Sequence, residues 1–353
     1  RMLHLWIRAE QRKNEKRVGI TPQDASKLIC KGIKVTVEES ADRIISTEEY
    51  HKVGCEIANQ HSWPGAPKAT IILGLKELSE NIELLEHKHI MFGHAFKGQT
   101  VGLKLLKKFK AGKGVLYDLE YLTDPEGRRL TAFGYWAGYA GAAVSLKAYA
   151  DQQNTKGICG PVSVFQNKEA MVDNIKNELV NVENKFPKIL VVGAMGRVGT
   201  GAIDFCQSLG LTVTKWDIQE TKNGEPFPEI LEHELFLNCI LAKPGAPAFI
   251  RNKHLNTIRK LRIIGDISCD PDSSFNPIPI YKSATNWAVP VVRINASQPL
   301  DVMAIDNLPS LLPYESSVDF SKQLLPLLLD LNKTSNSVWE RARETFLKSL
   351  NEV

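Results

Sequence analysis

The 353-residue sequence lacks the long apolar runs that membrane helices and secretory signals require. Its stretch richest in small and aromatic side chains, Ala132–Ala150, contains Lys147 and has too few large aliphatic residues to face lipid over about 20 positions. No small-residue cleavage site follows the first apolar residues, and Leu350–Val353 is not a peroxisomal signal. We therefore expect a cytoplasmic protein that does not bind membranes.

Cysteines are few and irregularly placed. The six cysteines form no CxxC pair and show no regular spacing, which favours reduced thiols in an intracellular protein over a disulfide framework. His87 and His89 could share one strand face as zinc ligands, but no third ligand is evident. We therefore expect no metal site.

The sequence also has little excess of charge of one sign. The net charge of +4 is spread along the chain. In its densest cluster, residues 104–110, lysines alternate with leucine and phenylalanine, as on the solvated face of an amphipathic helix. No basic-aromatic module accompanies this cluster, so we expect no nucleic-acid partner. The expected partners are small molecules, and a monomer is compatible with the sequence.

Apolar strand-like runs alternate with amphipathic helical runs along almost the whole chain, as in doubly wound α/β folds. We predict two Rossmann-like domains with parallel sheets: residues 1–132 with 309–353 for the substrate, and residues 133–308 for NAD. Such folds bind ligands at the carboxyl ends of their strands, so we expect the active site in the cleft between the domains, and domain closure on ligand. The predicted strands are 3–9, 34–40, 70–76, 89–95, 114–122, 188–194, 212–218, 234–240, 262–268 and 290–296.

A glycine turn joins a buried strand to a helix in "KILVVGAMGRVGTGAIDF", where Ala194, Gly196 and Gly199 occupy the positions of a dinucleotide-binding fingerprint. Glycines let the backbone approach a pyrophosphate, and the helix N-terminus favours negative charge. Asp217 ends the next strand, 18 residues after Gly199 (217 − 199), where a carboxylate accepts hydrogen bonds from the ribose. A carboxylate there repels a 2′-phosphate and favours NAD, although Lys215 and a further lysine at 222 leave NADP open. The alternative is a tight turn with an exposed aspartate.

Ionisable residues follow two buried strands of the first domain. Lys76 and Glu77 end "IILGLKE", and His94 ends "HIMFGHA". A lysine in a partly dry cleft can have its pKa tuned for proton transfer, and a histidine supplies a second acid/base group. Taken singly, Lys76 is as well explained as a surface cation and His94 as a cleft histidine. Together with the nucleotide turn, they indicate an acid/base pair.

Arginines precede two of the expected helices. Arg17 precedes a helix that should begin with Thr21 as N-cap and Pro22 at its first position. Arg128 and Arg129 follow a Glu-Gly turn, which alone would indicate an exposed surface turn. The glycines and alanines of 132–150 permit close backbone approach, so we expect a buried helix between the two domains.

Several of these stretches carry a resemblance. "RVGITP", the Lys76 strand, the glycine turn and "IDNLPSLLP" resemble the alanine dehydrogenase and transhydrogenase superfamily. "FGHAFKGQ", "YDLEYL", "GRRLTAFGYWAG" and "NPIPIY" are similar to the saccharopine dehydrogenase family, NAD-dependent and L-lysine-forming. The resemblance covers nearly the whole chain. It implies reversible oxidative deamination of saccharopine to L-lysine and 2-oxoglutarate, the last step of the aminoadipate pathway of lysine biosynthesis.

The resemblance also implies roles for single residues. Lys76 is the base for the amine and hydration steps, His94 is the acid for carbinolamine collapse, and Glu77 and Glu120 tune their charge. Lys97 adds a further cation. The implied substrate contacts are Arg17, Pro22, Gln99, Arg129, Phe133, Ser268, Cys269 and Asp270, and the implied cofactor contacts are Arg128, Gly196, Arg197, Asp217, Thr221, Leu241, Ile267, Ile305, Asp306, Asn307 and Leu308.

Two of these positions depart from the family pattern, and two other functions remain open. Leu241 stands where a tyrosine is expected, and Cys269 interrupts a run of substrate contacts. An alanine dehydrogenase-like deaminase would share Lys76, His94 and Asp306 but needs fewer carboxylate binders. A dinucleotide-sensing protein without turnover would not need the acid/base pair.

Overall fold

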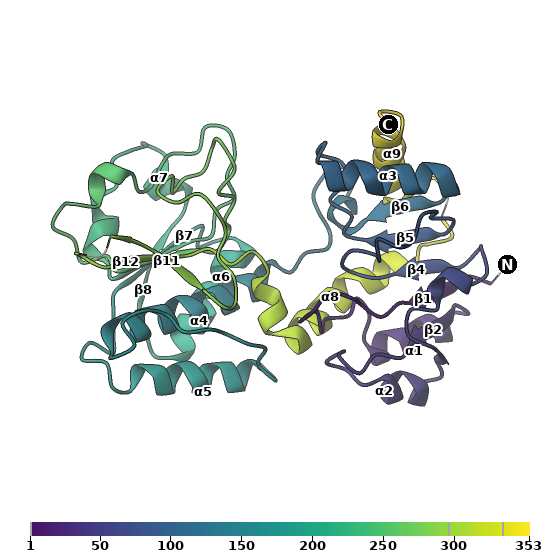
Figure 1. Ribbon diagram of the computed structural model, residues 1–353, viewed down its shortest axis with the longest axis horizontal. Helices are drawn as coiled ribbons and strands as arrows, with labels where there is room; N and C mark the ends of the chain where they lie inside the picture. The colour runs from purple at the N-terminus through teal and green to yellow at the C-terminus, as the bar shows by residue number, and fades with distance from the viewer. Residues whose placement is uncertain (1, 296, 334) are drawn as a thin grey trace. The chain divides into compact units, whose positions relative to one another are not determined.

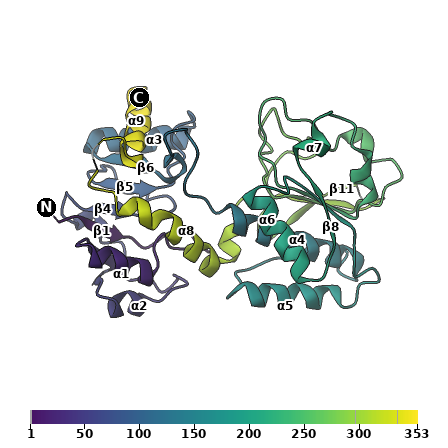
Figure 2. The same cartoon turned by 180° about the vertical axis from the view of Figure 1, so that it is seen from behind.

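The computed structural model describes residues 2–295, 297–333 and 335–353, and the chain divides into two compact units (Figure 1). The first comprises Arg1–Ala132 with Pro313–Val353, and the second comprises Phe133–Leu312. Each unit contains one six-stranded sheet with helices (Figures 1 and 2). The predicted fold class, two doubly wound α/β units, is confirmed.

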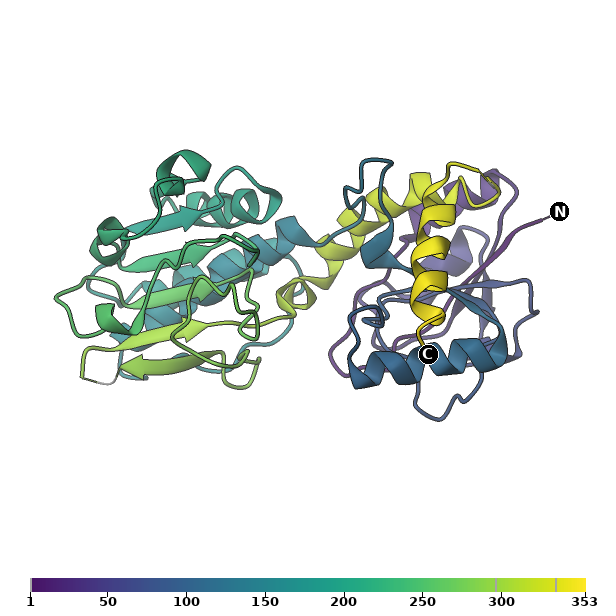
Figure 3. The ribbon, with the colours of Figure 1, turned by 90° about the horizontal axis from the view of Figure 1, so that it is seen from above.

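The sheet of the first unit is entirely parallel, with strand order β3-β2-β1-β4-β5-β6. Strands β2 and β3 lie on one side of β1, and β4, β5 and β6 lie on the other side. Right-handed crossovers in these two directions place α1 and α3 on opposite faces of the sheet (Figure 3). All six strands consequently end at the same edge. Their bounds are β1 His4–Ile7, β2 Lys34–Glu38, β3 Glu56–Ala58, β4 Ile71–Leu73, β5 Lys88–Met91 and β6 Val115–Asp118.

The helices of the first unit come from both ends of the chain. Thr21 caps α1 as predicted, since its side chain accepts a hydrogen bond from the Asp24 N–H and Pro22 occupies the first turn. Helix α8 contacts α1, and α9 contacts α3 and β6, so the C-terminal segment completes this unit. The helices are α1 Pro22–Cys30, α2 Thr47–Lys52, α3 Thr100–Gly112, α8 Pro313–Leu328 and α9 Val338–Leu350.

The sheet of the second unit has the order β11-β12-β10-β9-β7-β8, and only β11 runs antiparallel to its neighbour. The predicted strand at 290–296 corresponds to β11, except that residue 296 lies outside the described residues. The strands are β7 Ile189–Val192, β8 Val213–Trp216, β9 Leu235–Asn238, β10 Ile263–Asp266, β11 Val291–Asn295 and β12 Leu300–Met303, and the helices are α4 Gly134–Gln153, α5 Lys168–Leu179, α6 Arg197–Ser208 and α7 Ile218–Thr221.

The close backbone approach expected for residues 132–150 occurs within the second unit, through the small residues of α4. Helix α4 packs on α6, α5 and β10 of its own unit. A Cβ at Gly138 would lie 1.8 Å from the Val198 carbonyl oxygen, and one at Gly201 would lie 1.9 Å from the Tyr135 carbonyl oxygen. The two helices therefore meet backbone to backbone, which only glycine permits at these positions.

His89 lies in an aromatic cluster at the core of the first unit. Its side chain is completely buried, and among the described residues neither ring nitrogen has a hydrogen-bond partner. Its ring centroid lies 5.0 Å from that of Trp63 and 5.6 Å from that of Phe109. Burial, and then the charge of Arg8, hold the pKa of His89 well below its usual 6.5. His89 is therefore a neutral core residue.

We predict that His89→Leu reduces the acid sensitivity of folding. The unfolded chain binds a proton at His89 below pH 6.5 that the folded chain does not, so stability present above that pH is lost as pH falls. As pH falls, the free energy of unfolding should decrease less steeply in the variant, with a slope smaller by up to about 1.4 kcal/mol per pH unit. Urea titrations between pH 5 and 7 measure this. The exposed His51 supplies the control, His51→Gln, and equal slopes in all three proteins would contradict the prediction.

Candidate active site

Lys76 and His94 lie three residues beyond the ends of the adjacent parallel strands β4 and β5. Both contact the buried ring of Phe92. The Lys76 Nζ lies 5.9 Å from the ring centroid, and the His94 ring stacks on it at 6.4 Å. Both residues also line one cavity of about 530 Å³. The structure therefore brings the predicted acid/base pair together.

Arg129 joins this group from a different part of the chain. Its guanidinium carbon lies 5.6 Å from the centroid of Phe92, and its Nε donates to the Thr131 carbonyl oxygen at 2.7 Å. The neighbouring Arg128 is exposed and pairs with Asp124 at 2.8 Å across a tight turn. Of the two predicted arginines, Arg129 lies at the acid/base pair of the first unit, and Arg128 lies on the turn.

The environment of Lys76 favours the neutral amine. Burial, followed by the charge of Arg17, lowers the pKa of Lys76 to about 8, while Glu15 opposes the shift. Arg17 is itself buried against Glu15, with Nη2–Oε1 and Nε–Oε2 distances of 2.6 and 2.9 Å. An amine with this pKa can gain or lose a proton near neutral pH.

The remaining predicted residues of the first unit lie around this group. Glu77 pairs with Arg12 at 2.7 Å, and although partial burial opposes the shift, the hydrogen bond and charge of Arg12 lower the pKa of Glu77. Glu120 lies 3.6 Å from the Nζ of Lys97. Gln99 is the exposed N-cap residue of α3, and Pro22 is half-buried at the start of α1.

The backbone at His94 adopts an uncommon conformation. His94 has a φ of +50°, in the left-handed region that costs energy for a residue with a side chain. Two neighbours fix it: Asp118 accepts the Gly93 N–H at 3.0 Å, and a Cβ at Gly102 would lie 2.7 Å from the His94 carbonyl oxygen. Such conformations persist where the surroundings enforce them, and they concentrate at functional sites.

Sequence reasoning missed several charged residues of this site. They share a position near the carboxyl ends of β1 and β6, the strands that flank the β4–β5 pair. Ionisable residues that follow an apolar strand were the signal that identified Lys76, and the same signal applies here. The residues are Arg8, Glu10, Arg12, Glu15 and Asp118.

The glycine turn of the second unit has the geometry of a phosphate loop. Gly193 has a φ of +83°, and a Cβ at Gly199 would lie 2.0 Å from its carbonyl oxygen, so α6 begins tightly against the end of β7. Gly196 and Arg197 are exposed where α6 begins, and a helix N-terminus presents backbone N–H groups to an anion. This turn leaves space and donors for a pyrophosphate.

Asp217 reaches that turn from the end of β8. Its two carboxylate oxygens accept the N–H groups of Met195 and Ile218, each at 2.9 Å, and the Thr221 hydroxyl donates to its backbone carbonyl oxygen at 3.2 Å. A groove of about 680 Å³ runs alongside and includes Trp216. A carboxylate offers about four lone-pair positions, so Asp217 keeps capacity to accept a hydrogen bond from the adenosine ribose of a dinucleotide.

Other predicted residues follow β9, β10 and β12. The N–H groups of Ile267 and Ser268 both donate to the Asn238 carbonyl oxygen, at 3.1 and 3.2 Å. Burial raises the pKa of the Cys269 thiol to about 12, so this thiol is protonated and a poor nucleophile at neutral pH. Of the rest, Ile305 and Leu308 are buried, Asn307 is half-buried, Leu241, Asp270 and Asp306 are exposed, and Phe133 is the half-buried N-cap residue of α4.

A buried polar network also lies at these strand ends and was not predicted. Asn238 ends β9 and donates to Asp266, which ends β10, at 2.9 Å, and the Tyr281 hydroxyl donates to the same carboxylate at 2.5 Å. The network fixes the loops that begin at Cys239 and Ile267. A polar last residue in the otherwise apolar strands "LFLN" and "IIGD" was its signal.

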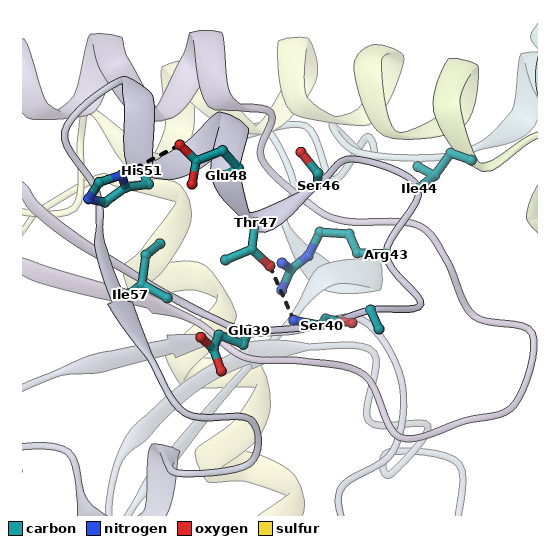
Figure 4. Close-up of a pocket in the computed structure, with 10 residues that line it drawn as sticks. Glu39, Ser40, Arg43, Ile44, Ser46, Thr47, Glu48, His51 and Ile57 are labelled. Carbon is teal, nitrogen blue, oxygen red and sulfur yellow. Dashed lines mark hydrogen bonds and ion pairs between the residues drawn. The ribbon is translucent and has the colours of Figure 1, made fainter.

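A separate hollow of about 650 Å³ lies beside α2 in the first unit (Figure 4). Its walls mix charges of both signs, and Thr47 Oγ1 accepts the Ser40 N–H at 3.2 Å. No predicted site residue lines it.

Among the described residues, no group of three or more His, Cys, Asp or Glu could bind a metal ion. Over the same residues, no helix is long and apolar enough to cross a membrane.

Comparison with known proteins relates this geometry to a family. Residues 6–140 match the family "Alanine dehydrogenase/PNT, N-terminal domain". An L-alanine dehydrogenase structure superposes with a TM-score of 0.71 at 17% identity, covering 98% of this chain and 94% of its own. The structure of a transhydrogenase from Sinorhizobium meliloti superposes with a TM-score of 0.61 at 18% identity, covering 93% of this chain and 94% of its own. At this identity these two structures support the fold alone.

Relatives of higher identity span nearly the full chain. "Saccharopine dehydrogenase [NAD(+), L-lysine-forming]" of Schizosaccharomyces pombe is 42% identical over 97% of this chain and 97% of its own. The protein of the same name from Candida glabrata is 44% identical over 97% of this chain and 95% of its own. The resemblance read from the sequence motifs is thereby confirmed, and the chain belongs to the saccharopine dehydrogenase [NAD(+), L-lysine-forming] family.

Proposed function

We propose that this protein catalyses the reversible reaction of saccharopine, NAD⁺ and water to L-lysine, 2-oxoglutarate, NADH and a proton. The observation that carries the proposal is the group around Phe92. An amine whose pKa is lowered to about 8, an imidazole and a guanidinium all contact this one ring. Full-length similarity to NAD(+)-dependent saccharopine dehydrogenases supports the choice of substrate and cofactor.

Saccharopine is a secondary amine, and its oxidation needs groups that move protons at two stages. Neutral Lys76 accepts the proton of the substrate amine, releases it to solvent, and then removes a proton from the water that attacks the imine. His94 then protonates the nitrogen that leaves as the carbinolamine collapses. The glycine turn and Asp217 would hold NAD⁺, which would supply the acceptor for the hydride of the carbon next to nitrogen. Glu77 and Glu120 tune the charge around the pair.

The three carboxylates of saccharopine require cationic partners. Arg17 and Arg129 carry planar guanidinium groups that suit carboxylates, and Gln99, Pro22 and Phe133 complete the proposed contacts. Arg17 already pairs with Glu15, so a substrate carboxylate would share a guanidinium whose charge is partly balanced. Ser268, Cys269 and Asp270 are proposed as further contacts, and the protonated Cys269 would act through its backbone or as a neutral side chain.

We assign NAD binding to residues 133–308 and substrate binding to 1–132 with 309–353. The proposed cofactor contacts in the second unit centre on the glycine turn and Asp217. We also propose a monomer in the cytoplasm, where the cysteines of the described residues, all of them free, would remain reduced. The remaining proposed cofactor residues are Arg128, Gly196, Arg197, Thr221, Leu241, Ile267, Ile305, Asp306, Asn307 and Leu308.

The first test concerns the acid/base pair. Lys76→Met and His94→Gln should each lower kcat by roughly 10²–10⁴, because each removes a group that transfers protons. NADH binding, followed by fluorescence titration, should change little, since both residues lie in the other unit from the glycine turn. Wild-type turnover in both variants would refute the assignment.

The second test concerns the substrate. We expect NAD⁺ reduction with saccharopine and, in reverse, NADH oxidation that requires lysine and 2-oxoglutarate together. Each charge-assisted carboxylate pair contributes about 1.5–3 kcal/mol, so alanine should give almost no turnover. Arg129→Ala should raise the KM for saccharopine far more than that for NAD⁺. Equal turnover of alanine and saccharopine would replace the proposal with an alanine dehydrogenase-like activity.

The third test concerns the cofactor. Asp217→Ala should weaken NAD⁺ binding and narrow the gap between NAD⁺ and NADP⁺, because the repulsion of the 2′-phosphate is lost. The measurement is the ratio of kcat/KM for the two cofactors. An unchanged ratio in Asp217→Ala would mean that another residue contacts the ribose.

A further inference from the structure

The backbone of Lys76 is bound by two side chains from the end of β1. The carboxylate of Glu10 accepts the N–H of Leu75 at Oε2 and that of Lys76 at Oε1, at 2.9 and 2.8 Å. Arg8 Nη2 donates to the Lys76 carbonyl oxygen at 2.5 Å, and its Nη1 lies 3.3 Å from Glu10. Both polar groups of the Lys76 backbone thus have charged partners.

This arrangement is enclosed and closely fitted. The side chains of Arg8 and Glu10 are 2% and 8% exposed. The Arg8 guanidinium lies flat against Gly74, where a Cβ would be 2.1 Å from its Cζ. Any residue other than glycine at 74 would displace the arginine, and Lys76 would lose its carbonyl partner.

Stability alone does not account for the pair. A buried ion pair often contributes little compared with an apolar replacement, because both charges lose their hydration. Here the Arg8 Nε also has no hydrogen-bond partner among the described residues, which adds a further cost. A similar contact occurs beyond β5, where Asp118 accepts the N–H of Gly93, the residue before His94.

We propose that Glu10 and Arg8 are positioning residues for the reaction: they fix the backbone of Lys76 so that its amine reaches the substrate nitrogen. The inference rests on the proposed role of Lys76 as the base. Neither residue needs to touch the substrate. The charged groups that act on the Lys76 amine are Arg17, Glu15, Arg12 and Glu10, and Glu10 is among those that favour its protonated form.

The test uses Glu10→Gln, which keeps the size of the side chain but can accept only one of the two N–H groups through its single oxygen. We expect kcat to fall about 10- to 100-fold, because a small misplacement of a catalytic group has effects of that size. We also expect the pH midpoint for acetylation of Lys76, followed by peptide mass spectrometry, to move to lower pH. NADH affinity should stay within about twofold, since the glycine turn lies in the other unit.

A double variant separates this inference from the proposed function. In the Lys76→Met background, Glu10→Gln should cause no further loss of kcat, since its effect passes through Lys76. A further 10- to 100-fold loss there would overturn the positioning role, as would an unchanged kcat or an unchanged midpoint in the single variant. If Lys76→Met itself retains full turnover, the proposed base fails, while the acetylation midpoint still reports whether the charge of Glu10 acts on the Lys76 amine.

Two further variants address folding. Arg8→Lys keeps the charge but loses the planar fork, so it should lower kcat while retaining NADH binding, and full activity would count against the proposal. Glu10→Asp keeps the charge on a shorter side chain and should recover part of the lost kcat. The control is Asp301→Asn in the second unit, which weakens the pair between the buried Asp301 and the half-buried Arg293, at 2.8 Å. It should lower Tm without moving the midpoint of Lys76, and a shifted midpoint would make the Glu10 effect nonspecific.

Discussion

Lys76 and His94 lie beyond the last ladder hydrogen bonds of their strands, and the rest of the first-unit site follows from that position. A parallel sheet places all its strand ends at one edge, but it does not fix the residues that extend past them. In this protein a carboxylate from a flanking strand does so on each side. Glu10 accepts N–H groups at Lys76, and Asp118 accepts the one that precedes His94.

The same edge concentrates charge in a partly dry environment. Burial and the charge of Arg17 both lower the pKa of Lys76, and Glu15, which pairs with Arg17, offsets part of that lowering. The pKa of the amine therefore falls to about 8 rather than further. A site built this way can contain several cations for an anionic substrate and still provide a neutral amine for proton transfer.

The sequence predicts the proposed site residues of the two units better than the residues that support them. Lys76, His94 and Asp217 each follow an apolar run, and that signal is local. Glu10 meets Lys76 only because β1 pairs with β4, although two strands separate them along the chain. Strand order is set by the packing of the whole sheet, and a local pattern does not contain it.

Two further elements show the same limit. No strand was expected at β3 or β12, because Glu56 opens the first and Asp301 interrupts the apolar run of the second. For the stretch 132–150, composition indicated that some backbone must approach closely, but not which one. The partner is α6, and that assignment needs the tertiary structure.

The contact between α4 and α6 has a consequence for how the second unit can change over evolution. Helix α6 begins at the turn that contains Gly196, so its distance from α4 sets where that turn lies relative to the sheet. A side chain at Gly138 or Gly201 would push α6 outward and carry the turn with it. Gly138 and Gly201 are therefore restricted in size by the position of a turn to which neither of them belongs.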